Sequence, residues 1–175
     1  LTRGQFERSI ELFTQAVVIA QKIGHKRSEC INLGGLGNVW YAQRRYQRAI
    51  DLFTRALNLA REIGAKHIEG IYIGNLGDAF AWLQRLEEAE GAFREAIPIC
   101  EDTFPVGAGA FRGSLALLLA QQDQIGQARE LLATGEPQVQ SDPDQTVKFL
   151  CRKGHVQLID DKPDAAKASL KQAED

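Results

Sequence analysis

The sequence predicts an all-α fold in which pairs of antiparallel helices stack into a solenoid, and three observations support this prediction. The chain repeats itself, because residues 33–60 return forty positions later as residues 73–100. Within each unit, apolar and small residues recur at helical spacing in two separate halves. Only Arg44 and Arg45 separate the two halves of the first unit, and so short a connection places two helices side by side in opposite directions. A fixed period of this length is typical of stacked helical repeats.

Nine helices are expected, and most are bounded by residues that start or stop a helix. They are predicted over residues 5–23, 26–43, 46–63, 66–83, 86–101, 105–122, 125–134, 143–159 and 163–174. Gly24 and Gly64 follow the first and third helices as C-terminal stops, because glycine readily adopts the left-handed conformation that ends a helix. Asp142, Pro143 and Asp144 are expected to start the eighth helix. We expect Pro98 to kink or loosen the last turn of the fifth helix.

The repeated pattern drifts in the second half of the chain. Asp102 or Thr103 is expected to cap the sixth helix, since both side chains accept hydrogen bonds from free backbone N–H groups. Gly135 and Pro137 are expected to end the seventh helix. Residues 135–142 then form the longest predicted loop.

A small residue marks the same position of every second helix and defines the repeats. It is Ser9, Ala49, Ala89, Ala128 and Ala166 in turn. The result is one solenoid of about four and a half repeats, with boundaries at residues 1–24 (partial), 25–64, 65–104, 105–142 and 143–175. Since the sequence contains no Met and its first repeat lacks a first helix, we expect the chain to be a fragment of a longer protein.

The residues at the repeated positions resemble those of the tetratricopeptide repeat (TPR). They are Leu36, Gly37, Trp40, Tyr46, Ala49, Phe53 and Ala56. The spacing of forty and the Asn-Leu-Gly-Asp of residues 75–78 look like the glycine-rich subclass found in kinesin light chains, Pins-type scaffolds and bacterial signalling proteins. The resemblance is strong over residues 4–100 and weaker afterwards, where Ala116 replaces Gly37 and Gln157 replaces Trp40. It implies a right-handed solenoid that binds other proteins.

Composition and charge exclude several classes of protein. Hydrophobic residues make up 44% of the chain and charged residues 25%, as in ordinary soluble domains. A net charge of −2 argues against nucleic-acid binding, and no apolar run approaches the roughly 18 residues that a membrane helix needs. We expect no signal peptide, because no cationic segment followed by an apolar stretch opens the sequence. The odd set Cys30, Cys100 and Cys151 fits buried thiols in a reducing cytoplasm, so we predict a cytoplasmic location and neither nucleic-acid nor membrane partners.

No group of side chains in the sequence has the spacing of an active site. His25 and His67 have no metal-ligand neighbours at suitable spacing. Cys151 and His155 are four residues apart, which leaves two interpretations: a core thiol beside a surface imidazole, or a reactive pair. The glycine-rich residues 107–113 lack the strand that precedes a phosphate-binding loop, so helix packing explains them better. We therefore predict no enzyme activity, no cofactor and no metal.

The candidate binding residues lie on the first helices of the second and third repeats, on the inner wall of the predicted solenoid. That wall is expected to carry Ile31, Gly34, Gly35, Asn38, Tyr41 and Ala42, then Ile71, Gly74, Asn75, Asp78, Ala81 and Trp82. In the resembled family, asparagines at such positions hydrogen-bond the backbone of an extended peptide, and an amide suits this because it donates and accepts. Asn38 and Asn75 match; Asp78 replaces the second asparagine and is able to bind a basic group instead. The alternative is that these are polar residues on a solvated helix surface.

The same face of the last repeat carries a second candidate group. Lys148, Arg152 and His155 recur at helical spacing and would hold an acidic segment of a partner. The alternative is a solvated charged face. The predicted peptide-binding groove is thus Asn38, Tyr41, Asn75, Asp78, Trp82, Lys148, Arg152 and His155.

The predicted function is a non-enzymatic module for protein–protein interaction, which binds a peptide or helix in its concave groove within a larger signalling or scaffold protein. The alternative is a regulatory or sensor segment of a kinase, cyclase or ATPase, which binds a ligand and changes curvature. RNA binding by helical repeats is disfavoured by the absence of a basic stripe. Self-association through the helix at 5–23 is also expected, because Leu12, Val18 and Ile19 point away from the following helix.

Overall fold

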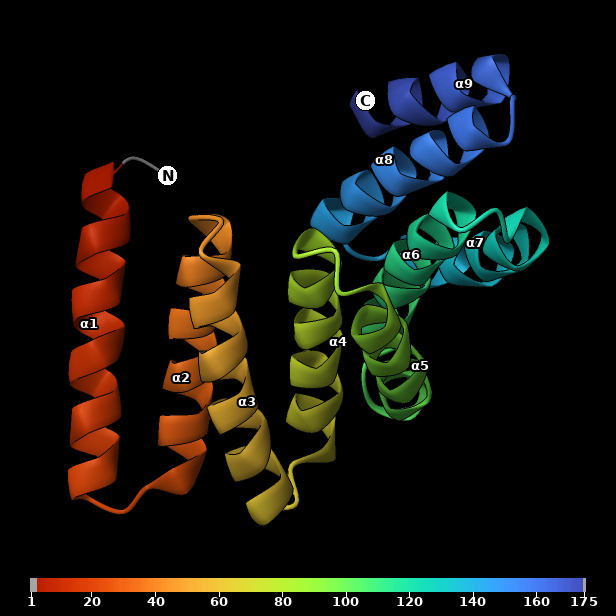
Figure 1. Ribbon diagram of the computed structural model, residues 1–175. Helices are drawn as coiled ribbons and strands as arrows, with labels where there is room; N and C mark the ends of the chain where they lie inside the picture. Colours follow the sequence, from red (N-terminus) through yellow and green to blue (C-terminus); the bar gives the residue numbers. More distant parts are fainter. Residues whose placement is uncertain (1–2, 175) are drawn as a thin grey trace. The chain divides into compact units, whose positions relative to one another are not determined.

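The computed structural model describes residues 3–174, and within this range it contains nine α-helices and no strand (Figure 1). The helices are α1 (Arg3–Lys22), α2 (Lys26–Ala42), α3 (Tyr46–Glu62), α4 (Lys66–Trp82), α5 (Leu86–Thr103), α6 (Pro105–Gln121), α7 (Ile125–Val139), α8 (Pro143–Ile159) and α9 (Pro163–Glu174). Leu1 and Thr2 of the first predicted repeat, and Asp175 of the last, lie outside the described residues. All nine predicted helices are present, and only the end of α7 differs by more than two residues.

The chain divides into two compact units, Leu1–Ala89 and Glu90–Asp175. In the first unit each helix packs against the next, so that α1 contacts α2, α2 contacts α3 and α3 contacts α4. Consecutive helices run in opposite directions, as the short connections require (Figure 1). In the second unit α6 packs against both α7 and α8, and α8 packs against α9. That all the repeats form one solenoid domain stays a prediction.

The seam of the first unit is centred on Phe53, as its repeated position predicts. This side chain is only 1% exposed, and the small residues Ala49 and Ala56 on the same face of α3 are fully buried. A Cβ atom added at Gly37 would lie 2.6 Å from the Phe53 ring, so the missing side chain lets α2 approach α3 closely. The Phe53 ring also packs against Tyr72 of α4, with ring centroids 6.2 Å apart.

In the second unit, backbone approaches backbone where α6 crosses α7. A Cβ atom at Gly109 would lie 2.7 Å from the carbonyl oxygen of Gly135, closer than such atoms come in folded proteins. Phe149 of α8 is fully buried and packs against Gly113, where a Cβ atom would lie 2.7 Å from the ring. The glycines of α6 therefore serve helix packing, as the sequence indicates.

The turns of the repeats use left-handed residues of two kinds. Gly24 and Gly64 have φ angles of +68° and +66° and end α1 and α3 as predicted. The turns inside the repeats use Arg44, Gln84, Asp123 and Asp161 in the same conformation, with φ between 54° and 63°. A left-handed conformation is uncommon for a residue with a side chain. It is held at Arg44 because the following N–H, of Arg45, reaches back over the helix end to the Trp40 carbonyl oxygen at 2.9 Å.

The predicted cap of the sixth helix is wrong. Asp102 and Thr103 both lie inside α5, and the Thr103 hydroxyl donates a 2.7 Å hydrogen bond to the Ile99 carbonyl oxygen. Phe104 occupies the cap position of α6 and makes no side-chain cap hydrogen bond. Pro105 follows it and has no N–H group, so one fewer backbone donor needs a partner there. At α8 the predicted start is confirmed, and the structure shows that Asp142 caps it, because a carboxylate oxygen of Asp142 accepts from the Gln145 N–H at 3.0 Å.

The predicted end of the seventh helix is also wrong, because α7 continues through Gly135 and Pro137 to Val139. Gly135 is buried against α6 and serves packing instead of ending the helix. Pro137 removes the N–H that would bond the Ala133 carbonyl oxygen. Ala133 is exposed, so water replaces that partner at little cost. The predicted eight-residue loop thus shrinks to residues 140–142.

A hydrogen bond to a glutamate spans the turn between repeats and is itself repeated. The Gln21 side chain donates to Glu29 at 2.7 Å, and forty residues later Arg61 donates to Glu69 at 3.1 Å. Lys66 also donates to Glu69, at 2.7 Å. Glu69 is 5% exposed, so these two cations compensate a carboxylate that is largely removed from water. The contact ties the last turn of α3 to the first turn of α4.

We expect the Glu69 contact to make stability depend on pH. Its hydrogen bond with Lys66 is the main reason that the pKa of the Glu69 carboxyl lies below its ordinary value. A lowered pKa means that the stabilisation is complete above the unfolded-state pKa of about 4.3 and is lost as the pH falls through the folded-state pKa. Between about pH 7 and pH 3, the wild type should lose roughly 1 kcal/mol more stability than Glu69→Gln, measured by urea unfolding.

Glu87→Gln is the matched control for this measurement, because Glu87 is exposed. It should lose as much stability on acidification as the wild type. An identical pH profile for the wild type and Glu69→Gln would show that the contact does not stabilise the fold.

Candidate functional site

Two of the predicted groove residues meet across the face that α2 and α4 share. The Asn75 side-chain amide of α4 donates to the Asn38 side-chain oxygen of α2 at 3.5 Å. Asn38 is exposed and Asn75 is half-buried. Among the residues that the structure describes, each amide makes only this one long contact, so both retain unused donors and acceptors.

A cluster of three aromatic rings lies on the same two helices, at their C-terminal ends. The Trp82 indole N–H donates a 2.8 Å hydrogen bond to the Tyr41 hydroxyl. The Trp82 ring is stacked on Tyr46, the first residue of α3, with centroids 5.6 Å apart and planes 3° from parallel. Tyr41 meets Tyr46 edge to face at 5.4 Å. Despite these contacts Trp82 is 61% exposed, so the ring is fixed in place without being buried.

Tyr72 explains why α2 and α4 lie close enough for these contacts. Its hydroxyl donates to the carbonyl oxygen of Cys30 on α2 at 3.1 Å, and its ring rests against Gly34, where any Cβ atom would clash with it. Burial raises the pKa of the Tyr72 phenol, which therefore stays protonated and keeps donating. The side chain fills the space between the two first helices.

The other predicted wall positions divide into surface and core. Ile31 is 48% exposed and Ala42 is exposed, as expected for the wall. Gly34 and Gly74 are buried, which corrects their predicted place on the surface of the groove. The physical reason at Gly34 is the Tyr72 ring that covers it. Asp78 is half-buried on α4, between Asn75 and Trp82.

The predicted cationic group lies on α8, in the second unit. Lys148 and His155 are exposed, and Arg152 is half-buried. Its neighbour Lys153 is instead engaged with Glu136 of α7, at 2.7 and 2.8 Å from the two carboxylate oxygens. The eight predicted site residues therefore form two groups, five on α2 and α4 of the first unit and three on α8.

Within residues 3–174 no group of three or more His, Cys, Asp or Glu residues is placed to hold a metal ion. Burial raises the pKa of the Cys30 thiol and raises that of Cys100 to about 11, so both are poor nucleophiles at neutral pH. Cys151 is only half-buried, which corrects its predicted place in the core, and His155 is on the surface. None of the helices in the described part of the chain is long and apolar enough to cross a membrane.

Sequence reasoning missed Tyr46 and Tyr72 as parts of this face. A signal was present, because Tyr41 and Trp82 break the forty-residue repeat, and Tyr46, at the aromatic position of the pattern, is replaced by a leucine in the next repeat. Their counterparts in the neighbouring repeat are Ala81, Leu86 and Ala42. The available clue was that three aromatic residues at one junction have no aromatic counterpart in the neighbouring repeat.

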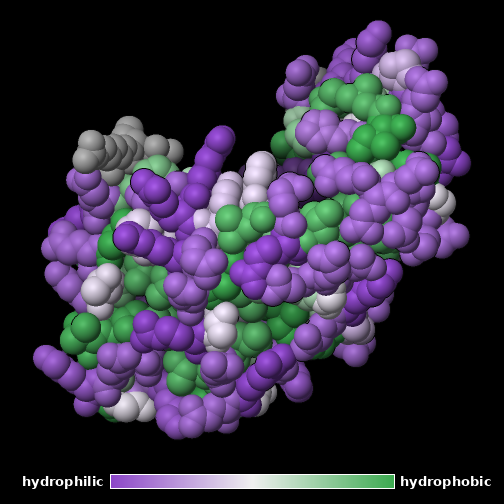
Figure 2. All heavy atoms as spheres, in the orientation of Figure 1, coloured by the Kyte–Doolittle hydropathy of each residue, from purple (hydrophilic) through white to green (hydrophobic). Residues whose placement is uncertain are grey.

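The exposed apolar face predicted on α1 is present. Leu12, Val18 and Ile19 are 49%, 43% and 58% exposed, and hydrophobic atoms show among hydrophilic ones over α1 (Figure 2). Phe13 turns the other way, against Gly35 of α2. Self-association through this face stays a prediction.

Comparison with known proteins agrees with this architecture. A family model for the tetratricopeptide repeat matches residues 1–62 and 28–102, which together cover more than half of the chain. No curated protein sequence matches the chain.

Several solved structures are similar. BtubC (BKLC) from P. vanneervenii has a TM-score of 0.78 at 18% identity, over 98% of this chain and 72% of that one. A Rap protein complexed with Competence and Sporulation Factor has a TM-score of 0.81 at 20% identity, over 97% of this chain and 48% of that one, so this chain spans about half its length. YrrB, described as a TPR protein with an unusual peptide-binding site, has a TM-score of 0.58 at 19% identity, over 97% of this chain and 77% of that one. The fold is thus an all-α helical-repeat solenoid.

Proposed function

We infer, because the chain belongs to the tetratricopeptide repeat family, that it is a non-enzymatic module for protein–protein interaction. The face shared by α2 and α4 binds an extended segment of the partner. The observation that carries this proposal is the pair Asn38 and Asn75, two amides from successive repeats placed 3.5 Å apart with unused donors and acceptors.

The arrangement suits a peptide backbone better than it suits other ligands. An extended peptide presents N–H and C=O groups in alternation, and each amide is able to donate to one and accept from the other. If Asn38 and Asn75 were merely solvated surface residues, their two side chains would not need to meet across the two helices. Here Tyr72 holds the two helices together beneath the amides, so the site is formed before the partner arrives and little ordering is needed on binding.

Two of the similar structures support this proposal. The Rap protein was solved in complex with Competence and Sporulation Factor, and YrrB carries a peptide-binding site. Lys148, Arg152 and His155 on α8 are proposed as a separate contact for an acidic segment, supported by the exposure of Lys148 and His155.

We expect the triple variant Asn38→Ala, Asn75→Ala, Asp78→Ala to lose peptide binding while it stays folded. None of the three side chains is buried, so unfolding free energy should change by no more than about 0.5 kcal/mol per site. Binding is measured on an array of short synthetic peptides of varied sequence. Peptides that the wild type retains should bind the triple variant at least about tenfold more weakly.

Asn58→Ala is the control, because Asn58 is an exposed asparagine on α3, away from the shared face. It should bind the array like the wild type. Equal binding by the triple variant would place the site elsewhere, and an array on which the wild type retains no peptide would contradict the proposed function itself.

A further inference from the structure

We propose that the exposed aromatic ledge formed by Tyr46 and Trp82, together with Arg44 and Arg45, binds an acidic, proline-containing segment of the partner. The inference rests on the proposed function and names the chemistry of the ligand. Three observations support it: one face of the Trp82 ring is open, two arginines without an ion pair lie at the same junction, and helix packing does not require the ledge.

Trp82 offers one open aromatic face and no hydrogen-bond donor. Its other face is covered by Tyr46, stacked at 5.6 Å, and its single N–H group is already donated to Tyr41 at 2.8 Å. With 61% of the residue exposed, the open face is available to a ligand. A ligand group that needs no polar partner and lies flat against a ring therefore fits this surface.

The ledge is not needed to build the repeat. The repeat at residues 65–104 has Ala81 and Leu86 at the positions of Tyr41 and Tyr46. The repeat at residues 25–64 has Ala42 at the position of Trp82. With those smaller residues in place, the corresponding segments still form helices. An exposed tryptophan is also unusual for a surface that touches nothing, since aromatic residues of this kind are enriched where proteins bind one another.

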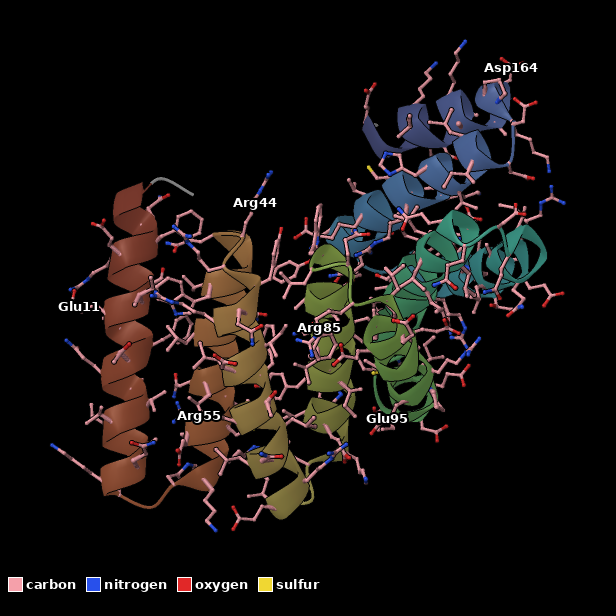
Figure 3. The ribbon with its side chains drawn as sticks, viewed as in Figure 1. Glu11, Arg44, Arg55, Arg85, Glu95 and Asp164 are labelled. Atoms are coloured by element: carbon pink, nitrogen blue, oxygen red, sulfur yellow. The ribbon has the colours of Figure 1, made fainter. Side chains whose placement is uncertain are left out.

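Two unpaired cations stand at the same end of the helices. Arg44 and Arg45 form the turn that leads into Tyr46, and among the residues that the structure describes neither forms an ion pair. Figure 3 shows the Arg44 side chain extending from the turn between α2 and α3 into solvent. The counterpart of Arg45 in the next repeat, Arg85, is paired with Glu88 in the first turn of the helix that follows it, α5. The free positive charge is thus particular to the junction that carries the ledge, and it favours a carboxylate in the ligand.

A proline ring meets the requirements of the open indole face. It is compact and apolar and packs its C–H groups against an aromatic face, and it lacks the backbone N–H that would otherwise need an acceptor there. Proline-rich segments are already extended, so they lose little conformational freedom on binding, and they are bound by aromatic-lined surfaces in other domains. Asp78 lies one turn before Trp82 on α4, so the acidic residue of the ligand is placed toward Arg44 and Arg45 and away from this carboxylate.

The test measures four labelled peptides of equal length by fluorescence polarisation. The first is acidic and contains two prolines; the others replace the prolines by alanine, the prolines by phenylalanine, or the acidic residues by glutamine. The protein variants are Trp82→Ala and Tyr46→Leu, which exchange residues between repeats, and the double variant Arg44→Gln with Arg45→Gln, which removes both charges. Arg55→Gln is the control, because Arg55 is an exposed arginine of α3 that forms no ion pair with any residue the structure describes. Circular dichroism verifies that each variant is folded.

The acidic proline peptide should bind the wild type at least about tenfold more tightly than each of the other three peptides. Trp82→Ala and the double arginine variant should each weaken the binding of this peptide by about tenfold. Tyr46→Leu should weaken it by less, and Arg55→Gln should not weaken it at all. The binding should also weaken as salt is added, because the charges are exposed.

Three results would overturn the proposal. If the phenylalanine or alanine peptide binds as tightly as the acidic proline peptide, the ligand does not need proline. If the glutamine peptide binds as tightly, the ligand does not need acidic residues. Unchanged binding by Trp82→Ala would show that the ledge is not the contact. If array peptides still need Asn38 and Asn75 in that case, the proposed function stands and only the ledge is rejected.

Discussion

Phe53→Ala is expected to lower the free energy of unfolding by about 3–5 kcal/mol, the usual range for removing a fully buried phenylalanine. Phe53 is 1% exposed and touches α2 at Gly37 and α4 at Tyr72. Truncation leaves a cavity at the point where three helices meet. Because the helices are held apart by other contacts, they cannot close the gap fully, and the loss of burial adds to the cost of the cavity. Chemical denaturation followed by circular dichroism measures the change.

Thr54→Ala provides the comparison, since Thr54 is the next residue along α3 and is exposed. Its free energy of unfolding should stay within about 0.5 kcal/mol of the wild-type value. A midpoint that Phe53→Ala leaves unchanged would contradict the register of the repeats, because another residue would then have to form the seam.

Gly109→Ala is expected to destabilise the protein by about 1–3 kcal/mol although alanine is the better helix former. The added carbon would lie 2.7 Å from the carbonyl oxygen of Gly135 and 2.8 Å from the Cβ atom of Gln138. Backbone cannot move aside as the end of a long side chain does, so α6 and α7 must separate. The same denaturation experiment detects the loss.

Gly91→Ala is the control with the opposite expected sign. Gly91 lies within α5, and a Cβ atom there would meet nothing within 4 Å. The change should therefore stabilise the protein by about 0.5–1 kcal/mol, the helix propensity gain alone. If Gly109→Ala also stabilised the protein, packing between α6 and α7 would be looser than the structure has it.

The expected results separate residues that build the repeat from residues that use it. Phe53, Gly109 and Glu69 occupy core or junction positions, and their changes should affect stability. Asn38 and Trp82 are exposed, and their changes should affect binding while leaving the fold intact. The departures from the repeat, more than the repeated residues, distinguish this surface from that of a generic helical array.

The sequence by itself determined the helices and their pairing, because both depend on local information that recurs every forty residues. Apolar spacing, the stops at Gly24 and Gly64, and the helix start at Asp142 and Pro143 each act within a few residues, and all are where they were expected. The end of α7 was not predicted. Gly135 and Pro137 are helix breakers judged locally, but Gly135 is the residue that lets α6 and α7 touch, and this benefit belongs to the packed structure.

For the candidate site, the sequence indicated which helix faces to consider and could not show which side chains meet on them. Asn38 and Asn75 were predicted to share a wall, and Trp82 and Tyr41 were placed on it. The stacking of Tyr46 on Trp82 and the covering of Gly34 by Tyr72 depend on the distance between α2 and α4. That distance is decided only in the tertiary structure, because Tyr72 holds the two helices together by a hydrogen bond to Cys30, forty-two residues away along the chain.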